Sequence, residues 1–104
     1  NSIPLNLKKV YPLTHHSIIR YAPQLEIINL EHCNIRELSK CLIKCENIRE
    51  IYLSNNHIPL IPHYITKLSN SVEIFDISHN QIPVIDAQEI LKWLGGRIKN
   101  IKLV

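Results

Sequence analysis

The sequence predicts an α/β solenoid, with a curved parallel β-sheet of about five short strands on one face and short helices or turns on the other. Two observations support this prediction. An apolar pattern of eleven residues recurs along the chain, with its first positions at Leu25, Ile48, Val72 and Ile98. The steps between these positions are 23, 24 and 26 residues, within the range of roughly 20–29 residues known for one class of stacked repeat.

The residues inside each copy point to a particular family. The complete copies span residues 25–35, 48–58 and 72–82, and a fourth begins at Ile98. They follow the pattern L-x-x-L-x-L-x-x-N/C-x-L, so the chain resembles the leucine-rich-repeat family over nearly its whole length. A further, imperfect copy begins the chain, with Lys8 in place of the usual Asn. The resemblance implies a right-handed superhelix with the sheet on its concave face, and a function in binding.

We expect a single domain over residues 1–104, divided into repeats 1–24, 25–47, 48–71, 72–97 and 98–104. The first and last of these are partial. Solenoids need terminal caps over their apolar ends, and the sequence contains no segment with that character. We therefore expect the chain to be a segment of a longer protein.

Each copy should form one strand near its fourth to sixth positions, because apolar residues there alternate with the period of two that a strand imposes. The expected inward pairs, in chain order, are Ile3/Leu5, Ile28/Leu30, Ile51/Leu53, Phe75/Ile77 and Ile101/Leu103. The ninth position holds Cys33, Asn56 or Asn80. An Asn side chain at this turn can bond backbone groups that would otherwise be buried without partners.

The return segments should lie on the convex side. Thr14 is a candidate cap for a first short helix ending near residue 21, before the helix-disfavouring Pro23. Residues 86–89 resemble a capping box, which predicts a last helix that starts at Asp86 and ends at Gly95. Between them, helix-like spacing predicts inward positions at Leu38, Leu42, Cys45, Ile61, Ile65 and Leu68.

The third, fifth, seventh and eighth positions of each copy should point outward from the concave sheet. Ile27, Tyr52 and Ile74 would be apolar anchors there, since the core does not require them and Tyr is frequent among binding hot spots. A merely solvated sheet face is the alternative. The full candidate partner-binding site is Ile27, Asn29, Glu31, His32, Glu50, Tyr52, Asn55, Ile74, Asp76 and His79.

The net charge of +3 raises the question of a nucleic-acid partner. On the concave positions, however, Glu31, Glu50 and Asp76 oppose only Lys102. We expect the other basic residues on the rims and convex side: Lys8, Lys9, Arg20, Arg36, Lys40, Lys44, Arg49, Lys67, Lys92, Arg97 and Lys99. A solvated surface is the simplest interpretation of this distribution.

Nothing in the sequence indicates catalysis, a metal or another cofactor. Cys41 and Cys45 are four residues apart, a spacing found in zinc sites, but we expect buried structural thiols because Cys33 and Cys45 occupy inward repeat positions. His32 and His79 lie two repeats apart, roughly 10 Å, which is too far to share one metal. The chain has only two glycines, and no glycine-rich phosphate-binding loop is present in the sequence.

The odd number of cysteines and the absence of an Asn-x-Ser/Thr site favour an intracellular location, cytoplasmic or nuclear. No apolar run is long enough for a membrane span, and no signal peptide is visible. We do not expect a membrane partner.

The expected function is binding of a protein or peptide partner through the concave sheet. One alternative comes from residues 18–30, which resemble the entry to a repeat in nuclear RNA export factors. That resemblance implies RNA transport, with RNA or protein bound at the basic flanks. The other alternative is a structural repeat segment beside a catalytic domain. The sequence does not indicate an oligomeric state.

Overall fold

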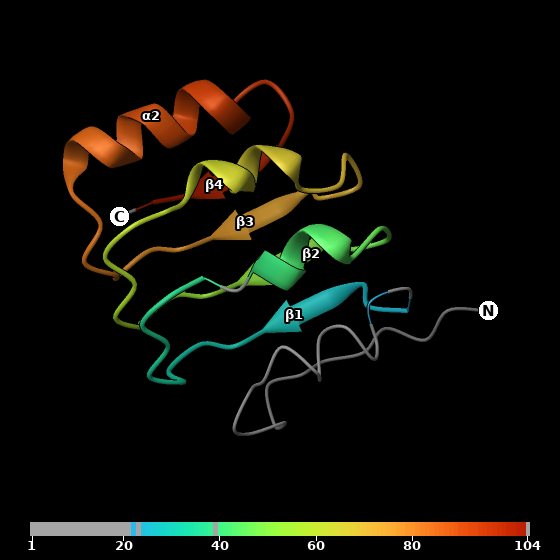
Figure 1. Cartoon of the computed structure of the whole chain (residues 1–104), viewed down its shortest axis with the longest axis horizontal. Helices are drawn as coiled ribbons and strands as arrows, with labels where there is room; N and C mark the ends of the chain where they lie inside the picture. Colours follow the sequence, from blue (N-terminus) through green and yellow to red (C-terminus); the bar gives the residue numbers. More distant parts are fainter. Residues whose placement is uncertain (1–21, 23, 39, 104) are drawn as a thin grey trace.

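The computed structural model describes residues 22, 24–38 and 40–103, and its core is one parallel sheet. Within these residues, four strands stack in chain order, as Figure 1 shows. They are β1 (Ile27–Asn29), β2 (Glu50–Tyr52), β3 (Ile74–Asp76) and β4 (Asn100–Lys102). The strand expected at Ile3 and Leu5, the helix expected after Thr14 and the imperfect repeat with Lys8 lie outside the described residues.

Residues predicted to share a column pair with one another in the observed strand register. Ile28 pairs with Ile51, Ile51 with Phe75, and Phe75 with Ile101. In β1, β2 and β3 the middle residue is fully buried while its two neighbours are half-buried. The period of two in each strand therefore separates a core side from an outward side, as expected.

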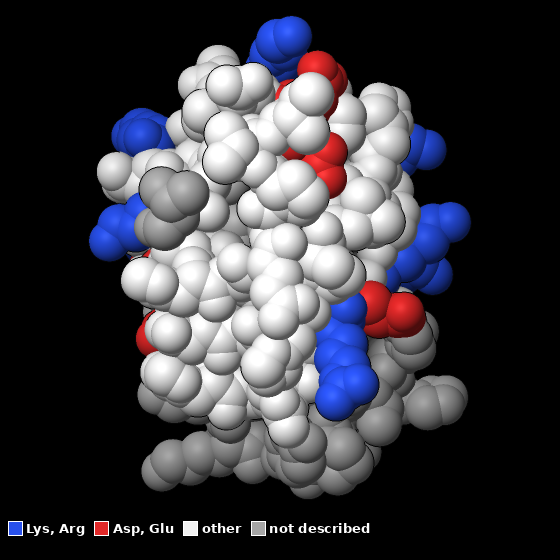
Figure 2. Space-filling view, turned by 90° about the vertical axis from the view of Figure 1, so that its left-hand side faces the viewer, with Lys and Arg blue, Asp and Glu red and all other residues white. Residues whose placement is uncertain are grey.

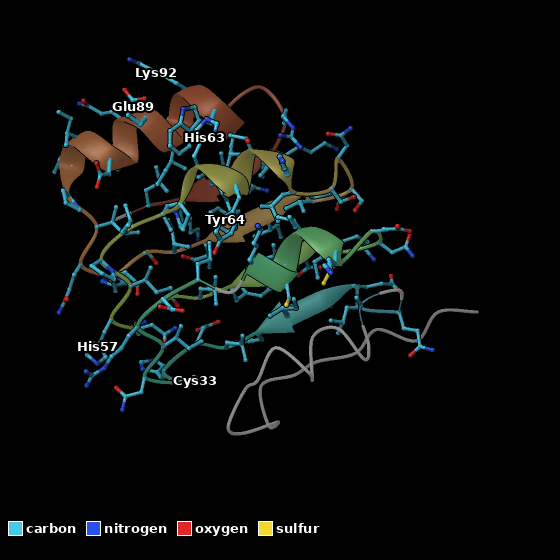
Figure 3. All side chains as sticks on the ribbon, viewed as in Figure 1. Cys33, His57, His63, Tyr64, Glu89 and Lys92 are labelled. Carbon is cyan, nitrogen blue, oxygen red and sulfur yellow. The ribbon has the colours of Figure 1, made fainter. Side chains whose placement is uncertain are left out.

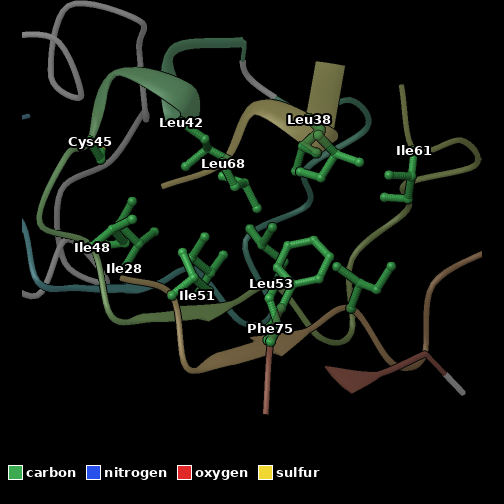
Figure 4. Close-up of a cluster of buried hydrophobic side chains, with 14 of the residues drawn as sticks. Ile28, Leu38, Leu42, Cys45, Ile48, Ile51, Leu53, Ile61, Leu68 and Phe75 are labelled. Carbon is green, nitrogen blue, oxygen red and sulfur yellow. The ribbon is translucent and has the colours of Figure 1, made fainter. Parts of the chain in front are cut away.

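The core lies between the sheet and the return segments (Figure 4). Its largest fully buried side chain is Phe75, and β-branched or leucine side chains fill most of the remainder. The inward positions predicted for the returns are all buried: Leu38, Leu42, Cys45, Ile61, Ile65 and Leu68. Each repeat thus buries its apolar residues against its neighbours.

The returns are short helices that stack along one side of the sheet (Figure 1). Two of them are 3-10 helices, η2 (Lys40–Lys44) and η3 (His63–Lys67). The third is the α-helix α2 (Val84–Leu94). The prediction that α2 starts at Asp86 is wrong: Pro83 is the N-cap residue, and Asp86 lies in the first turn. Pro supplies a fixed φ that suits a helix entry, and the helix ends at Gly95 as predicted.

Asparagines at the ninth position tie adjacent repeats together, as the sequence predicts. The Asn56 side chain donates to the carbonyls of Leu30, Leu53 and Ser54 and accepts from the amides of Cys33 and Ile35. One repeat later, Asn80 donates to the carbonyls of Leu53, Ile77 and Ser78 and accepts from the amide of Ile58. These side chains satisfy backbone groups at the turns, where the strand ladder no longer does so.

Within the described residues, no helix is long and apolar enough to cross a membrane. The three cysteines, Cys33, Cys41 and Cys45, form no disulfide bond.

Candidate functional site

Six of the predicted site residues form a grid on the outward side of the sheet. One row places Ile27 beside Glu50 and Glu50 beside Ile74. The second row places Asn29 beside Tyr52 and Tyr52 beside Asp76. All six side chains are half-buried, so they are packed along the sheet yet partly open to solvent. We call these six residues the concave grid.

The apolar members of the grid are not adjacent. Ile27 and Ile74 flank Glu50 within one row, and Tyr52 lies in the second row. None of the three belongs to the buried core cluster. The grid therefore offers apolar groups separated by a carboxylate.

Tyr52 and Glu50 are coupled, because the Tyr52 hydroxyl donates a hydrogen bond to Glu50 Oε1. This bond, reinforced by desolvation and by the charges of Glu50, Asp76 and Glu31, raises the pKa of Tyr52 to about 12. The neutral phenol is the donor, so removing its proton breaks the bond and adds a negative charge beside three others. Tyr52 is therefore an uncharged hydroxyl at neutral pH.

The sequence analysis missed the role of the second position of each copy. Arg49, which we expected on a rim or on the convex side, lies 3.5 Å from Glu26, 4.0 Å from Glu50 and 4.0 Å from Glu73. Its charge lies among three carboxylates beside the grid. The signal was present in the sequence, since the second positions read Glu26, Arg49, Glu73 and Lys99 and their charges alternate.

The remaining predicted residues lie after the strands. Glu31 is half-buried, and its backbone amide donates to Asn29 Oδ1. His32, Asn55 and His79 are exposed at the eighth position, with φ of 56°, 59° and 55°. The structure thus places these three in a separate column along the turns.

The left-handed backbone at the eighth position is a structural requirement that the sequence analysis did not identify. In this conformation the amides of His32 and Asn55 donate to the carbonyls of Ser54 and Ser78 in the next repeat. Asn and His tolerate positive φ better than most residues with a side chain. The turn therefore accounts for the residue types in this column without a partner.

The seventh position does not face outward as predicted in the second and third repeats. Ser54 and Ser78 are buried. The Ser78 amide and hydroxyl both donate to Asp76 Oδ1. Because the chain turns away from the sheet after the fifth position, the strict alternation ends there.

The basic residues of the return segments lie apart from the strands that form the grid. Figure 2 looks onto the turns that follow the strands, where most of the face is uncharged and Lys and Arg lie mainly at its margins. The described basic residues of the returns are exposed: Arg36, Lys40, Lys44, Lys67, Lys92 and Arg97. The Arg97 guanidinium donates to the carbonyls of Thr66 and Leu68, so its role is structural.

Among the described residues, the convex side carries one aromatic contact. His63 and Trp93 meet edge to face with ring centroids 5.0 Å apart, and Trp93 is partly buried against the core. Figure 3 labels His63 and Tyr64 on this side, away from the turn that carries His57.

In the described part of the chain, no three His, Cys, Asp or Glu residues lie close enough together to hold a metal ion. Burial, with a smaller effect from Cys41, raises the pKa of the Cys45 thiol to about 11. Cys45 is therefore a protonated core residue at neutral pH.

Comparison with known proteins agrees with this architecture. The Leucine Rich Repeat family model matches residues 47–68. Among solved structures, the fold is similar to that of a leucine-rich-repeat protein from Leptospira interrogans, with a TM-score of 0.59 and 20% sequence identity over 99% of this chain. The chain spans 29% of the length of that protein. No curated protein sequence matched the present chain. Residues 47–68 thus match the leucine-rich-repeat pattern, and the described chain has the leucine-rich-repeat solenoid fold.

Proposed function

We propose that the chain binds a protein or peptide partner across the concave grid. Solenoids of this class commonly use their extended concave surfaces for binding. The observation that carries the proposal is the grid itself: Ile27, Tyr52 and Ile74 lie on the outward side of the sheet and are not part of the buried core cluster.

The grid is held rigidly, which favours binding. The strands are joined by a continuous register, and the turns after them are held by Asn56 and Asn80. Side chains fixed in this way lose little freedom when a partner docks, so less of the interaction energy is spent on ordering them.

Charge defines the partner further. The grid and its margin carry Glu31, Glu50 and Asp76, and Arg49 is already surrounded by carboxylates. A partner segment that combines apolar side chains with Lys or Arg would complement this surface. We further propose an intracellular setting, which suits three cysteines that form no disulfide bond.

Alanine substitution on the two faces tests the proposal. Proteins that bind the immobilised wild-type chain from a lysate are identified, and their affinities are then measured for Tyr52→Ala, Ile74→Ala and the control Ile85→Ala. Ile85 is 69% exposed on α2, so its truncation removes a comparable side chain from the opposite side of the molecule. Tyr52→Ala should weaken binding by about 1–2 kcal/mol, roughly 5- to 30-fold, and Ile85→Ala should leave it unchanged.

Circular dichroism and urea denaturation establish that each variant is folded. Unchanged affinity for Tyr52→Ala and Ile74→Ala, with a loss for Ile85→Ala, would reject the concave grid and assign binding to the helical side.

A further inference from the structure

The spacing of one row of the concave grid restricts the shape of a partner. Strands β1, β2 and β3 lie side by side (Figure 1), and Ile27 pairs in register with Glu50 and Glu50 with Ile74. At about 4.8 Å between adjacent strands, the two isoleucines are roughly 10 Å apart. The half-buried Glu50 lies midway between them. A partner that covers this row must therefore present two apolar groups roughly 10 Å apart, with a polar group between them.

The carboxylate in the middle of the row is incompletely neutralised. Arg49 lies 3.5 Å from Glu26, 4.0 Å from Glu50 and 4.0 Å from Glu73. One guanidinium among three carboxylates leaves an excess of negative charge at this part of the sheet. A cationic group of a partner would complement the surface at Glu50.

The Tyr52 hydroxyl fixes the orientation of this carboxylate. It donates to Glu50 Oε1, whereas Glu50 Oε2 faces Arg49 at 4.0 Å, a distance too long for a hydrogen bond. Oε2 therefore keeps its lone pairs for a donor from a partner. Tyr52 lies two residues along the strand from Glu50, about 6.6 Å, so one helix about 10 Å wide can contact both residues.

Among regular peptide backbones, the α-helix matches the row. Helix residues i and i+7 lie on one face about 10.5 Å apart, and residue i+4 lies between them on nearly the same face. An extended strand repeats a face at about 6.6 Å and 13 Å, which misses one of the two isoleucines. A polyproline II helix repeats a face at about 9.3 Å, but it has no side chain on that face between the two repeats.

We propose that the concave grid binds an amphipathic α-helix of a partner protein, lying across β1, β2 and β3. Apolar side chains at helix positions i and i+7 contact Ile27 and Ile74, and an Arg or Lys at i+4 donates to Glu50 Oε2 beside the Tyr52 ring. This inference rests on the proposed function, because it needs the grid to be the binding surface. It adds the partner's secondary structure and the position of its charge.

A second copy of the chain matches the row less well. Its helix α2 carries Val84 and Leu91 seven residues apart, but Gln88 stands at the i+4 position. It therefore lacks the cation that would complement Glu50.

Designed helical peptides test the proposal. The probe is an alanine-based peptide of about 20 residues, long enough to populate a helix, with a side-chain staple on its far face. It carries Leu at i and i+7 and Arg at i+4. One control moves the second Leu to i+5, about 140° around the helix from the first. A second control lacks the staple and has a central Pro, which breaks the helix and keeps the Leu and Arg residues.

Binding to the whole isotope-labelled chain is followed by NMR titration. The probe should shift the amide signals of Ile27, Glu50, Tyr52 and Ile74. It should bind at least roughly tenfold more tightly than either control, because each control fails to bury one of the two Leu side chains against the grid.

A further peptide with Gln in place of Arg at i+4 tests the charge. The wild-type chain should prefer the Arg peptide by about three- to fivefold, the gain expected for a partly exposed ion pair. Glu50→Gln keeps an acceptor for the Tyr52 hydroxyl and should lose the preference, and Tyr52→Phe should reduce it. Lys67→Gln changes one charge on the exposed surface of η3 and should keep the preference.

Equal or tighter binding of the Pro peptide, with shifts still on the grid, would overturn the helix and leave the proposed function standing. Shifts confined to η2 and η3 would reject both. If the stapled probe causes no shift at millimolar concentration, the helix is wrong, and the affinity of captured partners for Tyr52→Ala still decides the proposed function. Sedimentation showing a dimer that is lost in Ile74→Ala would assign the grid to a second copy and would also overturn the proposal.

Discussion

At the scale of single residues, the backbone conformation at the eighth position of each repeat explains which residues occur there, without a role in binding. The sequence pattern identified His32, Asn55 and His79 as one column, and the structure keeps them in one column. The sequence pattern gave no indication of their positive φ, because it leaves this position open to any residue. Backbone geometry therefore explains a choice of residue that had suggested a partner.

Substitution of His79 tests that explanation. His79→Gly removes the side chain that conflicts with a left-handed backbone, so we expect unchanged or slightly raised stability. His79→Val should lower the free energy of unfolding by about 1–2 kcal/mol, since a β-branched residue fits positive φ poorly. Urea midpoints of both variants provide the measurement. Equal stability of the Gly and Val variants would show that φ does not determine this position.

Ionisation of Tyr52 gives a pH-dependent prediction. Its folded pKa, about 12, lies above the usual value near 10. The stabilisation from the Tyr52–Glu50 bond should therefore be complete below about pH 10 and disappear as the pH rises toward 12. Titration of phenolate absorbance, with Tyr52→Phe subtracted from wild type, should give a transition centred near 12. A difference curve centred near 10 would mean that the bond to Glu50 is absent in solution.

At the scale of the elements, side chains that reach between repeats hold the returns in place. Asn56 links the turn after β2 to the turn after β1, and Arg97 links the segment before β4 to the end of η3. The ninth-position asparagines were predictable because the pattern marks them. Arg97 was not, because its partners are backbone carbonyls about one repeat away, at a position that the pattern leaves free.

Asn56→Ala measures the strength of such a link. The substitution leaves the amides of Cys33 and Ile35 and the carbonyl of Leu30 without their side-chain partner. At about 1–3 kcal/mol for a buried group without a partner, we expect a loss of roughly 2–4 kcal/mol in unfolding free energy. The exposed Asn100, substituted in the same way, is the control and should cost less than about 0.5 kcal/mol. Similar losses for both variants would contradict the assigned role of Asn56.

At the scale of the whole molecule, the repeat period and the apolar columns were enough to predict the fold, the strand register and the inward residues. The start of α2 was missed because Pro83 could enter the helix as its N-cap residue, whereas the sequence offered Asp86 as a more conventional signal. The charged neighbours of the grid were missed because ion pairs across strands depend on side-chain direction as well as register.

The central claim is that the partner lies against the concave grid, and site-specific photo-crosslinking tests it most directly. A benzoylphenylalanine is placed at Tyr52 in one variant and at Leu60, which is 58% exposed on the return after β2, in another. The account predicts that irradiation joins the partner to the chain through position 52 and not through position 60. Crosslinking through position 60 alone, with both variants folded, would contradict it.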